Sequence, residues 1–160
     1  MEIQKRKRIR LKSYNYSQNG YYFITICTKD KKALLCKEDC ILIEEDNTFV
    51  LSEIGNMVRT ALENIETIYD GVRNDRYVIM PNHIHLLLCV NKDTETSISK
   101  IVQQMKSWVT KKAGHAIWQK SFYDHVIRNE TDYLEITSYI QMNPLKWQDD
   151  KYYKNGNEPG

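Results

Sequence analysis

Two histidines stand in an apolar stretch of the chain, YVIMPNHIHLLLCV at residues 77–90. The β-branched and large apolar residues of this stretch are typical of a buried strand. Because side chains alternate along a strand, His83 and His85 point to one face and Ile84 points to the other, into the core. The backbone positions of His83 and His85 are about 7 Å apart along the strand, so both rings can converge on one divalent ion. In the alternative interpretation, each ring only hydrogen-bonds a polar neighbour on an open sheet face.

A predicted helix near the carboxy terminus supplies residue types that a two-histidine site lacks. In DYLEITSYIQMNP, Tyr139 and Asn143 are four residues apart, hence one turn apart on the same helix face. A carboxamide oxygen is a hard ligand for Mg²⁺ or Mn²⁺ and leaves positions for phosphate oxygens and water. A phenol with a pKa of about 10 becomes a nucleophile only if the site helps it lose its proton. The combination predicts metal-assisted attack of Tyr139 on a phosphodiester.

Each assignment on this helix has a structural alternative. Tyr139 is also compatible with a core position on an amphipathic helix, and Asn143 with a polar helix end before Pro144. Tyr133 and Tyr123 rival Tyr139 as the nucleophile. The residues alone leave these alternatives open.

The order of the predicted elements indicates a fold class. The patterns predict a strand over 21–28, a hairpin with strands at 41–43 and 49–51, a helix from Ser52 to about Gly71, strands at 75–80 and 83–90, a helix from Thr96 or Ser97 to Lys112, a loop with a short extended segment within 114–128, and a helix over 130–143 that stops because of Pro144. With hairpin connections and helices able to cover one face, this order predicts an α+β sandwich with a mainly antiparallel sheet.

Helical spacing of apolar residues predicts which helix faces are buried. The core-facing residues are Ile54, Met57, Val58, Ala61, Leu62, Ile65 and Ile68 in the first helix, and Ile98, Ile101, Val102, Met105 and Val109 in the second.

Length and composition indicate one globular domain. The chain has 160 residues, of which 41% are hydrophobic and 28% charged, as in ordinary globular proteins. We expect a single domain over 1–160 with a basic arm at 1–12 and a polar tail at 148–160. No stretch reaches the ~20 apolar residues of a membrane helix, and the amino terminus lacks a signal-peptide core, so we expect a cytoplasmic protein without a membrane partner. The cysteines at positions 27, 36, 40 and 89 lack paired spacing and are expected to be buried thiols rather than zinc ligands.

Basic residues cluster in two places, although the net charge is only +2. Residues 4–12, QKRKRIRLK, hold six cations in nine positions, and Lys106, Lys111 and Lys112 form a second group. Such clusters are the usual electrostatic footprint of nucleic-acid binding. A solvated arm without a partner is an equally good interpretation of the first cluster.

Four segments carry a resemblance to a known family: YNYSQNGYYFITICT, VIMPNHIHLLL, WQKSFYDHVIRNETDY and YIQMNPLKW. In this order they resemble the single-tyrosine HUH transposases, and most closely the REP-associated tyrosine transposases, over about residues 8–147. The resemblance implies a ferredoxin-like, RRM-like α+β fold. The HUH strand would lie in the sheet, and the catalytic tyrosine would come from a carboxy-terminal helix.

The resemblance also implies roles for individual residues. His83 and His85 would bind the metal, Mg²⁺ or Mn²⁺, and Tyr139 would form a covalent 5′-phosphotyrosine bond and leave a free 3′-hydroxyl. Asn143 falls where mobile relatives usually carry glutamine as a third ligand and REP-associated relatives carry asparagine. This residue favours the REP-associated branch, whose members are domesticated relatives of insertion-sequence transposases. The implied activity is that of a metal-dependent single-stranded DNA endonuclease and strand transferase, in DNA transposition or REP-element processing.

The implied partner is single-stranded DNA with a hairpin, either REP-like or from a transposon end. Candidate contacts to its backbone and unstacked bases are Lys5, Arg6, Lys7, Arg8, Arg10, Lys106, Trp108, Lys111, Lys112 and Arg128. His125 and Arg128 are interpreted either as phosphate contacts near the site or as parts of an ordinary polar edge strand. Mobile relatives place the tyrosine helix of one subunit in the other's site, whereas the REP-associated branch can be monomeric, so a homodimer stays open.

Two other classes of function are compared with this one: a non-catalytic nucleic-acid-binding domain, and a metal-independent phosphoesterase of either the histidine-triad or the two-histidine type. A non-catalytic single-stranded nucleic-acid-binding domain of the same fold would keep the sheet and lose turnover, and the intact His83, His85 and Tyr139 count against it. A histidine-triad hydrolase would need a third alternating histidine, but position 87 is leucine. A two-histidine phosphoesterase would need His-x-Thr or His-x-Ser motifs, and the sequence contains none.

Overall fold

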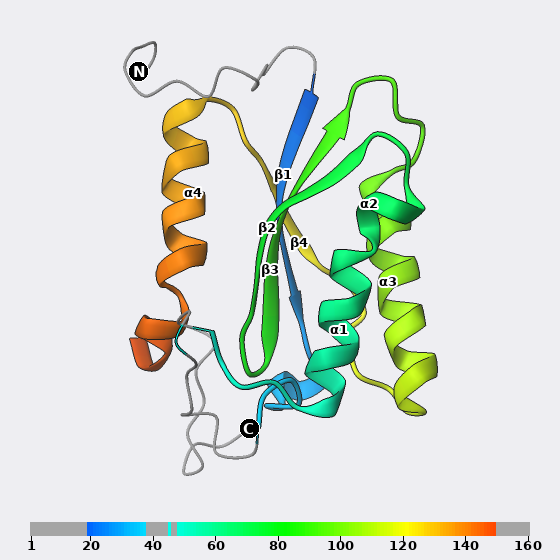
Figure 1. Cartoon of the computed structure of the whole chain (residues 1–160), viewed down its shortest axis with the longest axis vertical. Helices are drawn as coiled ribbons and strands as arrows, with labels where there is room; N and C mark the ends of the chain where they lie inside the picture. Colours follow the sequence, from blue (N-terminus) through cyan, green and yellow to red (C-terminus); the bar gives the residue numbers. More distant parts are fainter. Residues whose placement is uncertain (1–18, 38–44, 46–47, 150–160) are drawn as a thin grey trace.

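A four-stranded antiparallel sheet forms the centre of the computed structural model, which describes residues 19–37, 45 and 48–149 (Figure 1). The elements are β1 (Asn19–Cys27), the 3-10 helix η1 (Lys29–Lys31), α1 (Glu53–Glu63), α2 (Ile65–Ile68), β2 (Val72–Ile79), β3 (His83–Asn91), α3 (Ile98–Ala113), β4 (Tyr123–Val126), α4 (Glu130–Met142) and the 3-10 helix η2 (Pro144–Asp149).

The strand order is β2-β3-β1-β4, and every neighbouring pair is antiparallel. β1 lies along the whole of β3, from the pair Asn19–Asn91 to the pair Cys27–His83. Together with the chain order β1-α1-β2-β3-α3-β4, this is the ferredoxin-like arrangement. The predicted α+β fold class is therefore confirmed.

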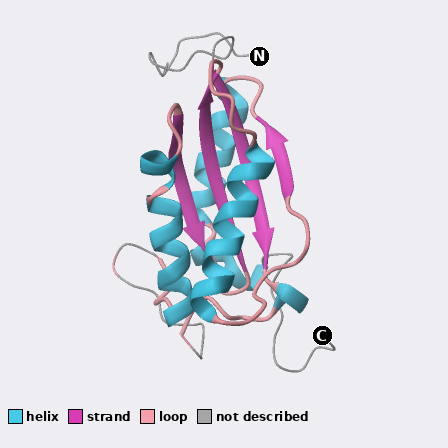
Figure 2. Cartoon of the chain, turned by 90° about the vertical axis from the view of Figure 1, so that its right-hand side faces the viewer, coloured by secondary structure: helices cyan, strands magenta, loops and turns pink. Residues whose placement is uncertain are grey.

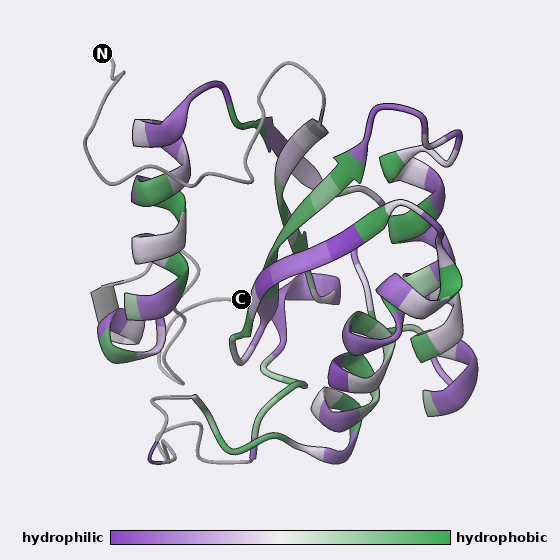
Figure 3. Cartoon of the chain, turned by 45° about the horizontal axis from the view of Figure 1, so that its top comes forward, coloured by the Kyte–Doolittle hydropathy of each residue, from purple (hydrophilic) through white to green (hydrophobic). Residues whose placement is uncertain are grey.

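Helices cover both faces of the sheet. Figure 1 shows α1, α2 and α3 on one side and α4 on the other, and Figure 2 shows α1 and α3 next to each other over the sheet. The prediction that the helices could all cover one face is therefore wrong. The reason lies in β3, which is apolar along most of its length (Figure 3) and buried on both faces. Leu86 and Leu88 pack under α1 and α3, whereas Leu87 and Cys89 pack on the α4 side.

The first predicted helix is interrupted. It begins as expected, with the Ser52 hydroxyl accepting a hydrogen bond from the Gly55 N–H at 3.0 Å. Gly55 allows a close approach, because a Cβ there would lie 1.9 Å from the Leu35 carbonyl oxygen. α1 ends at Glu63, Asn64 (φ −89°, ψ −4°) is its C-cap, and α2 follows from Ile65. The break turns Ile68 outward, so it is 63% exposed instead of facing the core as predicted.

The other two long helices start at the predicted places. The Ser97 hydroxyl caps α3 by accepting from Lys100 N–H, and Asn129 caps α4 by accepting from Asp132 N–H. The predicted core residues of α3 are buried, except for the half-buried Ile98. Gly114, at φ 85°, ends α3.

The helical path of the chain does not stop at Pro144. Although α4 ends at Met142, Asn143 keeps helical angles (φ −56°, ψ −48°), and the chain continues into η2. Proline is compatible with the first turn of a new helical segment, because that turn needs no N–H from it.

Several predictions fall partly or wholly outside the described residues. The basic arm, the first strand of the predicted hairpin at 41–43 and positions 150–160 of the tail lie there. In place of the second hairpin strand, Leu51 forms an isolated antiparallel bridge with Cys36. The described cysteines, at positions 27, 36 and 89, are buried and form no disulfide with one another. Within the described part of the chain, no helix is long and apolar enough to span a membrane.

Candidate active site

His83 and His85 lie next to each other at the start of β3 and are fully buried. Their ring centroids are 4.7 Å apart, with the ring planes at 75°. A tight turn precedes them, closed by a hydrogen bond from Met80 N–H to the His83 carbonyl at 2.8 Å. Ile84 packs in the core on the opposite face, as the alternation of side chains predicts.

Neighbouring polar groups orient both imidazoles. Nδ1 of His83 lies 2.8 Å from Oδ1 of Asn82, whose amide group also donates to the Lys31 carbonyl at 3.2 Å. Because an amide oxygen only accepts, Nδ1 of His83 carries the proton and Nε2 presents a lone pair. Nδ1 of His85 lies 2.8 Å from the hydroxyl of Thr25, its cross-strand neighbour on β1. That hydroxyl can accept from an Nδ1–H, a tautomer that again leaves a lone pair on Nε2.

α4 brings Tyr139 to the histidines. The Tyr139 ring centroid is 5.2 Å from that of His85 and 6.1 Å from that of Phe23. Phe23 in turn stacks on His85 at 5.1 Å, with an interplanar angle of 25°. Tyr139 is 41% exposed, so a substrate in solution can reach its side chain.

The two rival tyrosines occupy different positions. Tyr133 is buried against Tyr21, with ring centroids 5.6 Å apart, and its hydroxyl donates to Asp75. Burial, together with that carboxylate, raises the pKa of Tyr133 to about 12, which disfavours a phenolate. Tyr123 is exposed on the edge strand β4, opposite Thr25 and therefore two strands away from His85. Of the three, Tyr139 is the tyrosine whose ring contacts a histidine of the pair.

Asn143 follows Tyr139 by one helical turn and is only 3% exposed. Its amide nitrogen donates to the Tyr139 carbonyl at 3.3 Å, whereas Oδ1 is buried and accepts no hydrogen bond from any described residue. Trp147, one turn further on, lies 6.0 Å from the His83 ring. Asn143 therefore lies along the chain between two residues whose rings contact the histidine pair.

The residues around the histidine pair have the chemistry to hold a divalent cation. Within the described ranges, no three His, Cys, Asp or Glu side chains are grouped as metal ligands, so a metal beside the two histidines needs a ligand of another type. The buried Oδ1 of Asn143 belongs to such a type, since a carboxamide oxygen is able to bind hard cations. Two imidazole nitrogens and one oxygen would leave positions for water and phosphate oxygens.

Four residues at the site were not selected from the sequence: Phe23, Thr25, Asn82 and Trp147. Thr25 and Phe23 lie near His85 because of the β1–β3 register, which a single strand pattern does not define. Trp147 lies beside His83 because η2 follows α4 directly. The sequence predicted no helical segment after Pro144, so it gave no reason to expect this contact. The signal for Asn82 was its position directly before the histidines in the turn.

The predicted DNA contacts do not gather at the histidines. Lys106, Trp108, Lys111 and Lys112 belong to α3, on the opposite face of the sheet. Lys112 places Nζ 5.4 Å from the centroid of the Trp108 ring, which is partly exposed. The predicted contacts in the arm, from Lys5 to Arg10, lie outside the described residues.

His125 and Arg128 both contact Asp132, which lies in the first turn of α4. Nε2 of His125 lies 2.9 Å from Oδ2 of Asp132, and the same oxygen accepts from the Arg128 backbone N–H at 3.2 Å. Both side chains are exposed. These contacts attach the beginning of α4 to β4, and they agree with the interpretation of a polar edge strand.

Comparison with known proteins gives close sequence relatives, although no family model matches the chain. The chain is 36% identical to an uncharacterized protein of Haemophilus influenzae, over 94% of each chain. It is 32% identical to a REP-associated tyrosine transposase of Escherichia coli K12, over 82% of this chain and 70% of the relative. The solved structure of a REP-associated tyrosine transposase bound to a REP hairpin matches 94% of this chain and 77% of that one, with a TM-score of 0.64 and 23% identity. The structural match shows that the two share a fold.

Proposed function

Because the chain belongs to the REP-associated tyrosine transposases, as its likeness to the Escherichia coli member shows, we propose that it cleaves and rejoins single-stranded DNA through Tyr139. The observation that carries this proposal is the position of the partly exposed Tyr139, with its ring centroid 5.2 Å from that of the buried His85.

In the proposed reaction, the Tyr139 oxygen attacks the phosphorus of a phosphodiester. The bond from that oxygen to phosphorus forms, and the bond from phosphorus to the 3′-oxygen breaks. Overall, the proton of the phenol is transferred to the 3′-oxygen. The products are a 5′-phosphotyrosine and a free 3′-hydroxyl, and the reverse reaction with another 3′-hydroxyl rejoins a strand.

His83, His85 and Asn143 would hold the metal, Mg²⁺ or Mn²⁺. When bound, the ion would withdraw charge from a phosphate oxygen. The chain's own contribution is orientation, because Asn82 and Thr25 each hold one ring through Nδ1. The buried Oδ1 of Asn143 supports this ligand set.

The proposed substrate is hairpin-containing single-stranded DNA, since a protein of the same fold and family was solved with a REP hairpin. α4 contacts the histidines of its own chain, which favours a site completed within one protomer. A homodimer that exchanges this helix would need α4 to leave the position it has here.

The test uses the full chain and a labelled single-stranded hairpin oligonucleotide that carries the DNA flanking its own gene. With Mg²⁺ or Mn²⁺, the wild-type protein is expected to form an adduct that survives denaturing electrophoresis, and Tyr139→Phe is expected to form none. Tyr133→Phe and Tyr123→Phe are matched controls that should retain it. An adduct with Tyr139→Phe would exclude this residue as the nucleophile. Salt-dependent binding of the hairpin without any adduct would instead identify a binding domain.

A further inference from the structure

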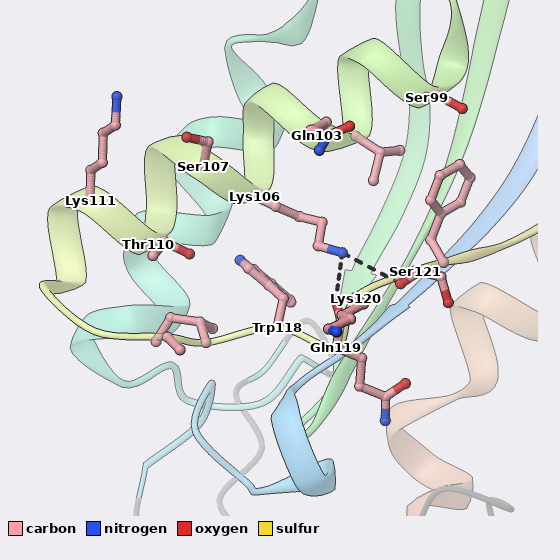
Figure 4. Close-up of a pocket in the computed structure, with 14 residues that line it drawn as sticks. Ser99, Gln103, Lys106, Ser107, Thr110, Lys111, Trp118, Gln119, Lys120 and Ser121 are labelled. Atoms are coloured by element: carbon pink, nitrogen blue, oxygen red, sulfur yellow. Dashed lines mark hydrogen bonds between the residues drawn. The ribbon is translucent and has the colours of Figure 1, made fainter.

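A cavity of about 700 Å³ lies between α3 and residues 116–122, which lead to β4 (Figure 4). Its volume lies within the range of about 300–1,000 Å³ that is typical of ligand pockets. Val102, Ile117 and Trp118 of its wall belong to the core between the sheet and α1 to α3. The cavity is therefore on the opposite face of the sheet from the candidate active site.

The wall of this cavity is held in place from two sides. Lys29 N–H donates to the Ile117 carbonyl at 2.8 Å, and Gln119 N–H donates to the Cys27 carbonyl at 3.0 Å. From α3, Nζ of Lys106 reaches across the cavity to the carbonyl of Gln119 at 2.6 Å and that of Ser121 at 3.4 Å (Figure 4). A wall attached in this way is a preformed surface for a ligand.

The indole of Trp118 presents a buried donor. The side chain is 9% exposed, and its Nε1–H has no acceptor among the described residues. In Figure 4 the indole lies along the cavity, with its nitrogen turned towards α3. An indole nitrogen can only donate, and a buried donor without an acceptor is unfavourable. A ligand that brings an acceptor would remove this cost.

The charge around the cavity has one sign. Lys106, Lys111 and Lys120 line it, and the lining residues include no Asp or Glu. Two carbonyls use two of the three N–H groups of Lys106, so one remains for a ligand. Burial lowers the pKa of Lys106, and an anion in the cavity would oppose this effect. Phe122 and Trp118 add aromatic surface.

We propose that this cavity binds one nucleotide of single-stranded DNA, with the base against Phe122 and Trp118 and a phosphate at the lysines. A base offers both a flat ring for the aromatic residues and acceptors for the indole N–H, and the phosphate supplies the negative charge. The choice of DNA as the occupant rests on the proposed function.

The position of the cavity agrees with that choice. Trp118 bridges to Thr28, which directly follows Cys27, and Cys27 is the cross-strand partner of His83. The cavity and the histidines are therefore at the same end of the sheet, on opposite faces. A DNA strand that passes around this end can occupy both.

The test follows the indole N–H resonances of the isotope-labelled full chain by NMR. The chain has three tryptophans, Trp108, Trp118 and Trp147, and single Trp→Phe variants assign their signals. On addition of a short oligothymidylate, the Trp118 signal is expected to shift. The same concentration of inorganic phosphate, or of an oligoglutamate peptide, is expected to leave it in place.

The outcomes separate this proposal from the proposed function. An unmoved Trp118 signal at saturating oligothymidylate overturns the cavity proposal, and an equal shift with phosphate or oligoglutamate overturns the choice of a nucleotide. In either case, Trp147 beside His83 reports separately whether DNA reaches the candidate active site. The adduct assay with Tyr139 then decides the catalytic proposal by itself.

Two variants test the assignment by affinity. Trp118→Phe keeps an aromatic side chain, although a smaller one, and loses the N–H, and it should bind the oligothymidylate about fivefold more weakly. Lys120→Gln should reduce the slope of log K against log salt by about 0.7, the value for one phosphate contact on a single strand. Lys100→Gln, on an exposed position of α3 that does not line the cavity, is the matched control. An equal effect of Lys120→Gln and Lys100→Gln would mean that only general surface charge acts, which would overturn the assignment.

Discussion

Replacing Asn143 with leucine should leave stability in chelator unchanged or raised, and should reduce the stabilisation that metal brings. In a chelator, the substitution removes a buried carboxamide oxygen that lacks a hydrogen-bond partner among the described residues, and such an atom costs about 1–3 kcal/mol. It also removes the 3.3 Å bond to the Tyr139 carbonyl, which contributes about 0.5–1 kcal/mol. The free energy of unfolding of Asn143→Leu should therefore equal that of the wild type or exceed it by up to about 2.5 kcal/mol.

Metal should stabilise the wild type more than the variant. At a Mn²⁺ concentration about a hundredfold above the dissociation constant, the wild type gains about 2.7 kcal/mol. If the loss of one ligand weakens binding about tenfold, the variant gains only about 1.4 kcal/mol at the same concentration. The metal-dependent gain should therefore be about 1.3 kcal/mol smaller in Asn143→Leu.

Urea denaturation of both proteins, in chelator and in Mn²⁺, measures the four free energies that are needed. Thr137→Val is the matched control, because it removes a hydrogen bond from the same helix, to the Leu134 carbonyl, and leaves His83, His85 and Asn143 unchanged. Its metal-dependent gain should equal that of the wild type. The same gain in Asn143→Leu as in the wild type would refute the role of Asn143 as a ligand, and no gain in the wild type would refute the metal site.

Three further predictions concern the surroundings of the site. Thr25→Val, which removes the contact to Nδ1 of His85, should lower Mn²⁺ affinity and the rate of adduct formation about 10- to 100-fold; unchanged values would show that this hydroxyl does not orient the ring. Ile84→Ala opens a cavity at a fully buried position and should cost about 2–5 kcal/mol in urea denaturation, so a loss below about 1 kcal/mol would contradict its place in the core. The pKa of Tyr133 is raised to about 12 by burial and by Asp75, above the unfolded value of about 10; the stabilisation from this group is therefore present below about pH 10 and lost as the pH rises to about 12. The melting temperature should fall more steeply over this range in the wild type than in Tyr133→Phe, and parallel curves would contradict the shift.

The local part of the site could be predicted from the sequence. The shared face of His83 and His85 follows from the alternation of side chains on a strand. The spacing of Tyr139 and Asn143 follows from the period of a helix. Both patterns depend only on residues within one element, so they do not depend on how the elements pack against each other.

The parts that depend on contacts between elements could not be predicted in this way. The pairing of Thr25 with His85 requires the register of β1 on β3, and the return of Trp147 requires η2 after Pro144. The side of the sheet that α4 covers also depends on packing: the apolar Leu87 and Cys89 share a face with the histidines and need a cover of their own.

The packing of α4 explains how one helix can serve both the core and the chemistry. α4 runs antiparallel to β3, because its early residue Tyr133 packs against Tyr21, the β1 partner of Cys89. Its later residue Tyr139 contacts His85 at the other end of the strand. Packing on the apolar half of this face, at Leu87 and Cys89, thus fixes the position of α4. The polar half, with the two histidines, then lies next to Tyr139. Tyr133 is therefore a core residue of this helix, while Tyr139 is held beside the histidines by that packing.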